Sequence, residues 1–85
     1  TEFTVEKLDR NRWRVNGMLP VEDFQKIYPA LKGLQEVDTM GGLLVALKEV
    51  VPSVGESATI DGLQLIAVVA DDRRVRELVV KRSNR

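Results

Sequence analysis

The stretch from Asp38 to Pro52, DTMGGLLVALKEVVP, constrains the fold more than any other part of the chain. Its apolar residues recur at steps of three and four, which is typical of a wide apolar stripe along an amphipathic helix. Thr39 is suited to cap the N-terminus with its hydroxyl, and Pro52 ends the run. We therefore expect a helix from Asp38 to Pro52. Its buried stripe would consist of Met40, Leu43, Leu44, Leu47, Val50 and Val51.

Two adjacent glycines, Gly41 and Gly42, fall in the first turn of this helix. Glycine inside a helix costs roughly 1 kcal/mol relative to alanine, so the pair needs another reason. Free N–H groups at a helix start can bind an anion, whereas a backbone passing close by excludes any Cβ atom. We favour the second explanation, in which the helix packs closely on a sheet.

A hairpin is expected at the start of the chain. The segments Phe3–Leu8 and Arg12–Asn16 alternate in polarity as strands do, and the polar residues 9–11 between them suit a turn. Trp13 is the only tryptophan. We interpret it as a core anchor or a lid over the helices, and a ligand-stacking role is the less favoured alternative.

A short helix from Val21 to Tyr28 is expected next, with its end set by Pro29. Its buried side would consist of Val21, Phe24, Ile27 and Tyr28. The following loop, residues 30–37, bends at Gly33. Its apolar side chains indicate that it lies on the core rather than in solvent. These side chains are Leu31, Leu34 and Val37.

Three more strands are expected at the end of the chain, at Ser57–Ile60, Leu63–Ala70 and Arg74–Arg82. Asp61 and Gly62 favour a type I′ hairpin turn, which needs positive φ at both central positions. The strand Leu63–Ala70 is apolar on both of its faces apart from one glutamine, which is typical of a strand that is covered on both faces or central in its sheet.

The last strand does not alternate regularly. Val75 belongs to one face by its position, whereas Leu78 and Val80 belong to the other. A β-bulge near Arg76 and Glu77 would bring all three apolar residues to the core side. The order is then β-β-α-α-β-β-β. It predicts an α+β fold with a mostly antiparallel sheet and two helices on one face.

The composition narrows the function. The chain has 85 residues, of which 44% are hydrophobic and 31% are charged, a balance typical of one small globular domain. Lys and Arg number 13 and so do Asp and Glu, and neither half of the chain is strongly basic. This argues against nucleic acid as a partner. The apolar runs are shorter than the ~18 residues of a membrane span, so we expect no direct membrane insertion by this segment.

Residues with catalytic or metal-binding chemistry are scarce. The sequence contains no cysteine and no histidine, which removes thiolate chemistry and the commonest general base and metal ligand. The serines lack a histidine to activate them, so we assign no catalytic residue, no metal ligand and no cofactor. Asp71 and Asp72 are neighbours in an expected turn, where adjacent side chains usually point apart. We interpret Asp9 and Asn11 as turn formers, and the basic residues Lys81, Arg82 and Arg85 as a solvated, frayed end.

Taken in order, several segments resemble the transporter-associated domain of the CorC/HlyC type. They are WRVNGMLPVEDF at residues 13–24, DTMGGLL at 38–44, VPSVGE at 51–56 and DGLQLIAVVADDRRVRELVV at 61–80. The resemblance covers nearly the whole chain. It is weakest at residues 30–37, where loop length varies in such domains.

The resemblance implies where the domain lies in a parent protein and where that protein is located in the cell. Residues 1–85 would form one domain at the C-terminus of a longer bacterial membrane protein, on the cytoplasmic face of the inner membrane. Its partners would be the transmembrane and CBS domains of the parent chain. Relatives are labelled magnesium and cobalt efflux proteins or hemolysin-like proteins. The fold resembles a subdomain of PCMH-type FAD-binding domains, and no catalytic residues carry over.

Three functions follow from these observations. The first is a non-catalytic regulatory or interaction domain that modulates transport of ions or other substrates, with contact through the Gly41–Gly42 helix end or a free sheet edge. A homodimer through a sheet edge is compatible with it. The alternatives are a flavin or adenine-nucleotide binding module, suggested by fold analogy alone, and a divalent-cation sensor that uses carboxylates.

Overall fold

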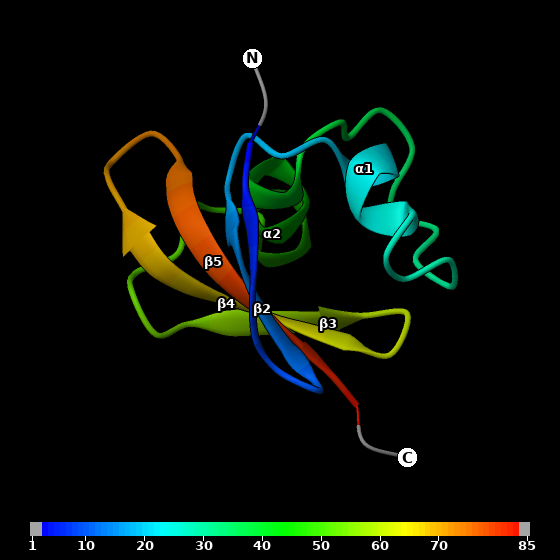
Figure 1. Cartoon of the computed structure of the whole chain (residues 1–85). Helices are drawn as coiled ribbons and strands as arrows, with labels where there is room; N and C mark the ends of the chain where they lie inside the picture. Colours follow the sequence, from blue (N-terminus) through cyan, green and yellow to red (C-terminus); the bar gives the residue numbers. More distant parts are fainter. Residues whose placement is uncertain (1–2, 84–85) are drawn as a thin grey trace.

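A five-stranded antiparallel sheet with two helices forms the fold of the computed structural model, which describes residues 3–83 (Figure 1). The strands lie side by side in the order β1-β2-β5-β4-β3, so the last strand in sequence occupies the centre of the sheet. All four neighbouring pairs are antiparallel, which confirms the expected α+β fold. The elements are β1 Val5–Asp9, β2 Arg12–Asn16, α1 Val21–Gln25, α2 Met40–Lys48, β3 Ser57–Ile60, β4 Leu63–Ala70 and β5 Val75–Arg82.

Both helices share one hydrophobic core with a single face of the sheet. In the view of Figure 1, α2 lies behind β1 and β2, and its buried residues join those of α1 and of the strands β2, β4 and β5 in one cluster. Trp13 of β2 meets Phe24 of α1 edge to face, with 5.5 Å between ring centroids. Trp13 is 6% exposed, which confirms its interpretation as a core anchor.

Helix α2 begins as expected and ends early. The Thr39 hydroxyl accepts a 3.0 Å hydrogen bond from the Gly42 N–H, which confirms the predicted cap. The helix stops at Lys48 because Glu49 adopts a left-handed conformation, with φ of 64°. The extension to Pro52 was therefore wrong, and Val50 of the predicted stripe is 61% exposed.

Helix α1 is also shorter than the sequence predicts. It ends at Gln25 instead of Tyr28, although the N–H groups of Ile27 and Tyr28 still donate to the Phe24 carbonyl. Pro29 disfavours the helical region at Tyr28, the residue before it, and the helix already ends with its C-cap at Lys26. Ile27 is 41% exposed and was wrongly placed on the buried side.

Strand β4 is paired on both edges but covered on one face only. Its residues alternate between buried and half-buried, and the fully buried ones face the helices. The alternative that the strand is covered on both faces was therefore wrong. The other alternative, a strand in the interior of the sheet, is confirmed, because β4 lies between β5 and β3. The β4–β5 register shifts at Val68 and again at Arg76. The second shift confirms the predicted bulge, and it brings Val75 to the core beside Leu78 and Val80.

The turn between β3 and β4 also holds the loop that follows α1. Asp61 and Gly62 have φ of 54° and 84°, as a type I′ turn requires. The Asp61 carboxylate accepts N–H groups of Lys32 at 2.8 Å and of Gly33 at 3.2 Å. The loop therefore lies on the molecule, with Leu31 fully buried, although Leu34 is 40% exposed and was expected to pack inward.

Candidate functional site

The start of α2 is closed by its own chain. The Gly41 N–H donates to the Gly17 carbonyl at 2.8 Å, and the Gly42 N–H is used by Thr39. A Cβ atom on Gly41 would lie 2.8 Å from the Val75 carbonyl oxygen. Close packing of backbones, rather than an anion site, thus accounts for Gly41. Because Gly41 is buried, this helix end does not form the expected contact surface.

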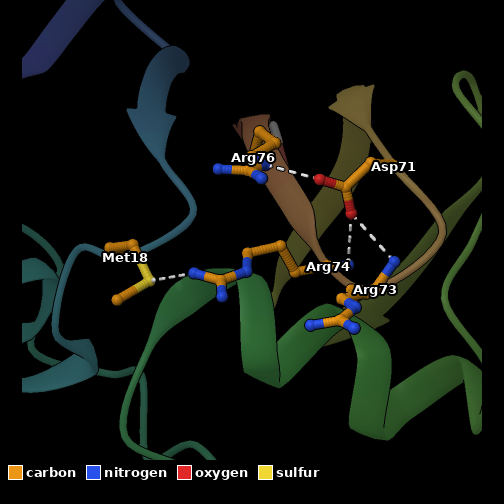
Figure 2. Close-up of polar contacts among 5 residues, drawn as sticks. All are labelled: Met18, Asp71, Arg73, Arg74 and Arg76. Atoms are coloured by element: carbon orange, nitrogen blue, oxygen red, sulfur yellow. Dashed lines mark hydrogen bonds and ion pairs between the residues drawn. The ribbon is translucent and has the colours of Figure 1, made fainter.

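The turn between β4 and β5 is organised by one carboxylate (Figure 2). Asp71 Oδ1 accepts the N–H groups of Arg73 and Arg74 at 2.8 and 2.9 Å, and its Oδ2 accepts Arg76 Nε at 2.7 Å. The two backbone hydrogen bonds, followed by the bond and charge of Arg76, hold the pKa of Asp71 well below its ordinary value. Both carboxylate oxygens are therefore engaged within the turn, as structural ligands of their own loop.

Asp9 has the same role in the turn between β1 and β2. Its Oδ1 accepts the Asn11 N–H at 2.9 Å, and its Oδ2 accepts Arg12 Nε at 2.8 Å. These bonds, the one from Asn11 first, lower the pKa of Asp9. The interpretation of Asp9 as a turn former is confirmed. Among residues 3–83 the structure contains no cluster of three or more Asp or Glu residues placed to hold a metal ion.

Within residues 3–83, no helix or loop covers the face of the sheet opposite the helices, and we call the central row of this face the open face. The row crosses all five strands in register, because Glu6 pairs with Arg14, Arg14 with Val79, Val79 with Ile66 and Ile66 with Ser57. Each member lies on the side opposite its buried neighbours in the same strand. Directly opposed side chains in such a row are about 4.5–5.5 Å apart at Cβ. The open face is therefore one continuous strip.

The open face has an apolar centre and polar margins. Val79 and Ile66, on the strands β5 and β4, are half-buried by their neighbours within the sheet. On one side Arg14 pairs with Glu77, with 2.7 Å between Nη2 and Oε1. On the other side the Gln64 amide donates to the Ser57 hydroxyl at 3.1 Å. An apolar centre within a polar rim is the usual anatomy of a protein–protein contact.

This surface was not recognised from the sequence. The apolar residues of β4 were attributed to two covered faces or to a central position in the sheet, yet one set of them faces away from the helices. The usable signal was the alternation of β5, where Glu77, Val79 and Lys81 occupy the face opposite Leu78 and Val80. Because this face of β5 carries both charged and apolar side chains, it indicates that β5 and the neighbouring β4 are exposed on this side of the sheet.

Comparison with known proteins identifies the family. The sequence profile of the CorC_HlyC family, described as a transporter associated domain, matches residues 6–84. The chain belongs to the CorC_HlyC family. It is 36% identical over 80 residues to the magnesium and cobalt efflux protein CorC of Escherichia coli K12, a match that covers 94% of the chain and 27% of that protein. The CorC of Salmonella typhimurium LT2 is 33% identical over the same share of both proteins.

Solved structures of CorC_HlyC domains confirm the fold. A CorC-associated region from Neisseria meningitidis MC58 superposes with a TM-score of 0.85 at 31% identity and covers 92% of this chain and 96% of its own. A Xylella fastidiosa CorC_HlyC domain, solved in complex with Mg²⁺ and Mn²⁺, has a TM-score of 0.79 at 21% identity, with 99% of this chain and 100% of that one covered. At that identity the likeness establishes the fold alone.

The chain therefore corresponds to one part of a larger transport protein in its relatives. It spans 27% of the length of the CorC proteins that it matches. Within residues 3–83 no helix has the length and apolar character needed to cross a membrane. The family is defined by association with transporters and not by an enzymatic activity.

Proposed function

We propose that this chain is a non-catalytic regulatory or interaction domain of a bacterial membrane transport protein of the hemolysin-like or magnesium and cobalt efflux type. The family and the names of the relatives support the transport context. The open face is the observation that carries the interaction role, because it has an apolar centre of Val79 and Ile66 and a polar rim.

The occupant of the open face is another part of the transporter chain to which the domain is attached. The relatives carry nearly three quarters of their length outside the matched segment, since the match covers 27% of them. A tethered neighbour is present at a high effective concentration, on the order of millimolar for short flexible linkers. A strip with a small apolar centre is then sufficient for binding, although it would be weak between free molecules.

Regulation follows from unequal contact in two states of the transporter. If the open face binds the neighbour in one state better than in the other, the population shifts toward the better-bound state. The coupling free energy is typically about 1–3 kcal/mol, which a few aliphatic contacts and one ion pair can supply.

The resemblance supports the position of the domain within the parent protein. Residues 1–85 form one domain at its C-terminal end, on the cytoplasmic face of the inner membrane. The neighbours are its CBS and transmembrane domains. A homodimer through a free edge of β1 or β3 is the second arrangement, because both strands have one neighbour only.

Deletion of the domain tests the proposed function. The parent protein without residues 1–85 would be compared with the intact protein for Mg²⁺ and Co²⁺ efflux and for assembly in the membrane. Altered transport at equal membrane abundance is the expected result. Unchanged transport together with unchanged assembly would contradict the proposal.

The two alternative functions gain no support. The family model and the solved structures described above are transporter-associated domains, and they lend no support to a flavin or nucleotide site. A cation sensor would use carboxylates such as those of Asp71 and Asp9. Their oxygens already accept hydrogen bonds within their own turns. Binding a cation there would require breaking these bonds.

A further inference from the structure

Three segments meet at one end of the sheet, in the lower part of Figure 1. The Arg82 N–H donates to the Asn11 carbonyl at 2.7 Å, which holds the end of β5 to the turn between β1 and β2. The Ser83 N–H donates to the Gly62 carbonyl at 2.8 Å, which holds it to the turn between β3 and β4. Lys81 and Arg82 are thus fixed within β5 and are not part of a frayed end, while Arg85 lies outside the described residues.

This end carries an excess of positive charge, and we call it the basic end. It is formed by Arg10, Arg12, Lys81 and Arg82. Its two acidic residues are engaged, because Asp9 binds Arg12 and the Asp61 carboxylate accepts two backbone N–H groups. Within residues 3–83, Arg10, Lys81 and Arg82 form no ion pair.

Two of the basic side chains are also opposed in an unfavourable way. Arg12 and Lys81 are direct partners in the β2–β5 ladder. Like charges directly opposite in an antiparallel pair destabilise the sheet. Asp9 offsets the charge of Arg12, which leaves Lys81 as the member of this pair without a carboxylate partner among residues 3–83.

The surface beside Lys81 is hollowed on both sides. One hollow, of about 440 Å³, is lined by Arg10, Asn11 and Arg12 among others, and it includes Lys81. A second, of about 640 Å³, includes Lys81, Arg82, Gln64 and Thr59. Both volumes fall within the ~300–1,000 Å³ typical of small-molecule sites. Lys81 therefore stands where the two hollows meet, with a hydroxyl and an amide as further hydrogen-bonding groups.

We propose that the basic end binds phosphate groups. Ammonium and guanidinium groups form short, charge-assisted hydrogen bonds with phosphate oxygens, and Lys81 lines both hollows, with Arg10 in one of them and Arg82 in the other. The phosphate can belong to a soluble ligand or to an anionic lipid headgroup, and the test separates these sources. The inference does not rest on the proposed regulatory function.

The test compares two double variants that lose the same charge. Lys81→Gln with Arg82→Gln alters the basic end, and Arg73→Gln with Arg74→Gln alters an exposed turn at the opposite end of β5. All four side chains are exposed, so both variants should fold. The first probe is sodium pyrophosphate, which is titrated at constant ionic strength. Its binding is measured from the amide chemical shifts of the chain. The second is sedimentation with phosphatidylcholine vesicles with or without one-third phosphatidylglycerol.

Saturable shifts at Asn11, Gly62, Arg82 and Ser83 are expected with pyrophosphate if the ligand is soluble, and binding only to the anionic vesicles is expected if it is a lipid. Each basic residue near an anionic lipid surface contributes separately to binding, so the Lys81 and Arg82 variant, which loses two charges, should bind ~30-fold more weakly. The Arg73 and Arg74 variant should bind like the unaltered chain. Absence of binding to both probes, or equal weakening in the two variants, would overturn the proposal.

Discussion

The backbone N–H of Gly41 donates a 2.8 Å hydrogen bond to the carbonyl oxygen of Gly17. Gly17 in turn donates to the Arg76 carbonyl at 2.7 Å. The start of α2, the end of β2 and the start of β5 therefore meet backbone to backbone. This contact sets the distance between α2 and the sheet and explains why no side chain is present at either glycine.

Gly41→Ala should destabilise the fold, while Gly42→Ala should not do so to the same extent. Both gain about 1 kcal/mol of helix propensity. The new Cβ at Gly41 would lie 2.8 and 2.9 Å from two backbone oxygens that cannot rotate away, whereas at Gly42 the nearest atom is the Thr39 hydroxyl. Overpacking typically costs about 1–3 kcal/mol. Urea unfolding of both variants measures the difference, and equal free energies of unfolding would contradict the contact.

Phe24→Ala should remove most of the stability of the domain. Phe24 is fully buried and contacts the Trp13 ring edge to face. A buried Phe→Ala change costs about 3–5 kcal/mol, a large share of the ~5–15 kcal/mol that stabilises a typical domain. Trp13 fluorescence during urea unfolding provides the measurement. Ile27→Ala, on the exposed side of the same segment, is the control and should change the free energy of unfolding little. A small effect at Phe24 would show that the core is not organised around this pair.

Element types were predictable from the sequence because each was marked by local chemistry. Thr39 capped its helix, and Asp61 with Gly62 formed the expected hairpin turn. Boundaries were less predictable. The apolar periodicity of α2 continues to Val51 in the sequence. However, Glu49 adopts a left-handed backbone conformation, which ends the helix and leaves Val50 exposed to solvent. Nothing in a hydrophobic pattern reports where a backbone must turn to reach the next strand.

Asp61→Ala should destabilise the domain more than Asp61→Asn. The carboxylate of Asp61 holds the loop after α1, and Asp61 adopts positive φ. Alanine removes the acceptor and is strained at positive φ, with an expected cost of about 1–3 kcal/mol. Asparagine keeps one acceptor oxygen and tolerates this conformation. Thermal unfolding ranks the two variants, and the opposite rank would exclude the loop-holding role.

The stability contributed by Asp71 should disappear in acid. Its pKa is lowered in the folded state by the N–H groups of Arg73 and Arg74 and by Arg76. A carboxyl with a lowered folded pKa stabilises the fold above its unfolded pKa, here near 3.8, and loses that contribution as pH falls below this value.

Unfolding measurements between pH 5 and pH 2 check this expectation. Asp71→Asn should flatten the acid limb of the stability curve, because the variant has no carboxyl to protonate. Asp72→Asn is the matched control, because it removes one exposed carboxylate from the same turn and keeps the hydrogen bonds of Asp71. This variant should leave the slope unchanged. Identical curves for Asp71→Asn and the unaltered chain would contradict the role of this carboxylate.

The surface chemistry was less accessible to sequence analysis than the fold. The open face depends on pairings between residues far apart in the chain, such as Arg14 with Val79 and Ile66 with Ser57. The basic end depends on Arg82 lying beside Asn11. Strand order determines both surfaces, and local sequence patterns do not specify strand order. The family resemblance supplied the transport context but no residue of either surface.

The most direct measurement is Mg²⁺ and Co²⁺ efflux by the intact parent protein carrying Val79→Lys, compared with the same protein carrying Val50→Lys. Val79 lies at the centre of the open face, and Val50 is an exposed valine that follows the helix on the other side of the sheet. Both variants add one positive charge outside the buried core, at a half-buried position for Val79 and at an exposed position for Val50. If the open face regulates transport by contact, Val79→Lys should alter efflux at equal membrane abundance and Val50→Lys should not. Equal efflux in both variants and the unaltered protein would contradict it.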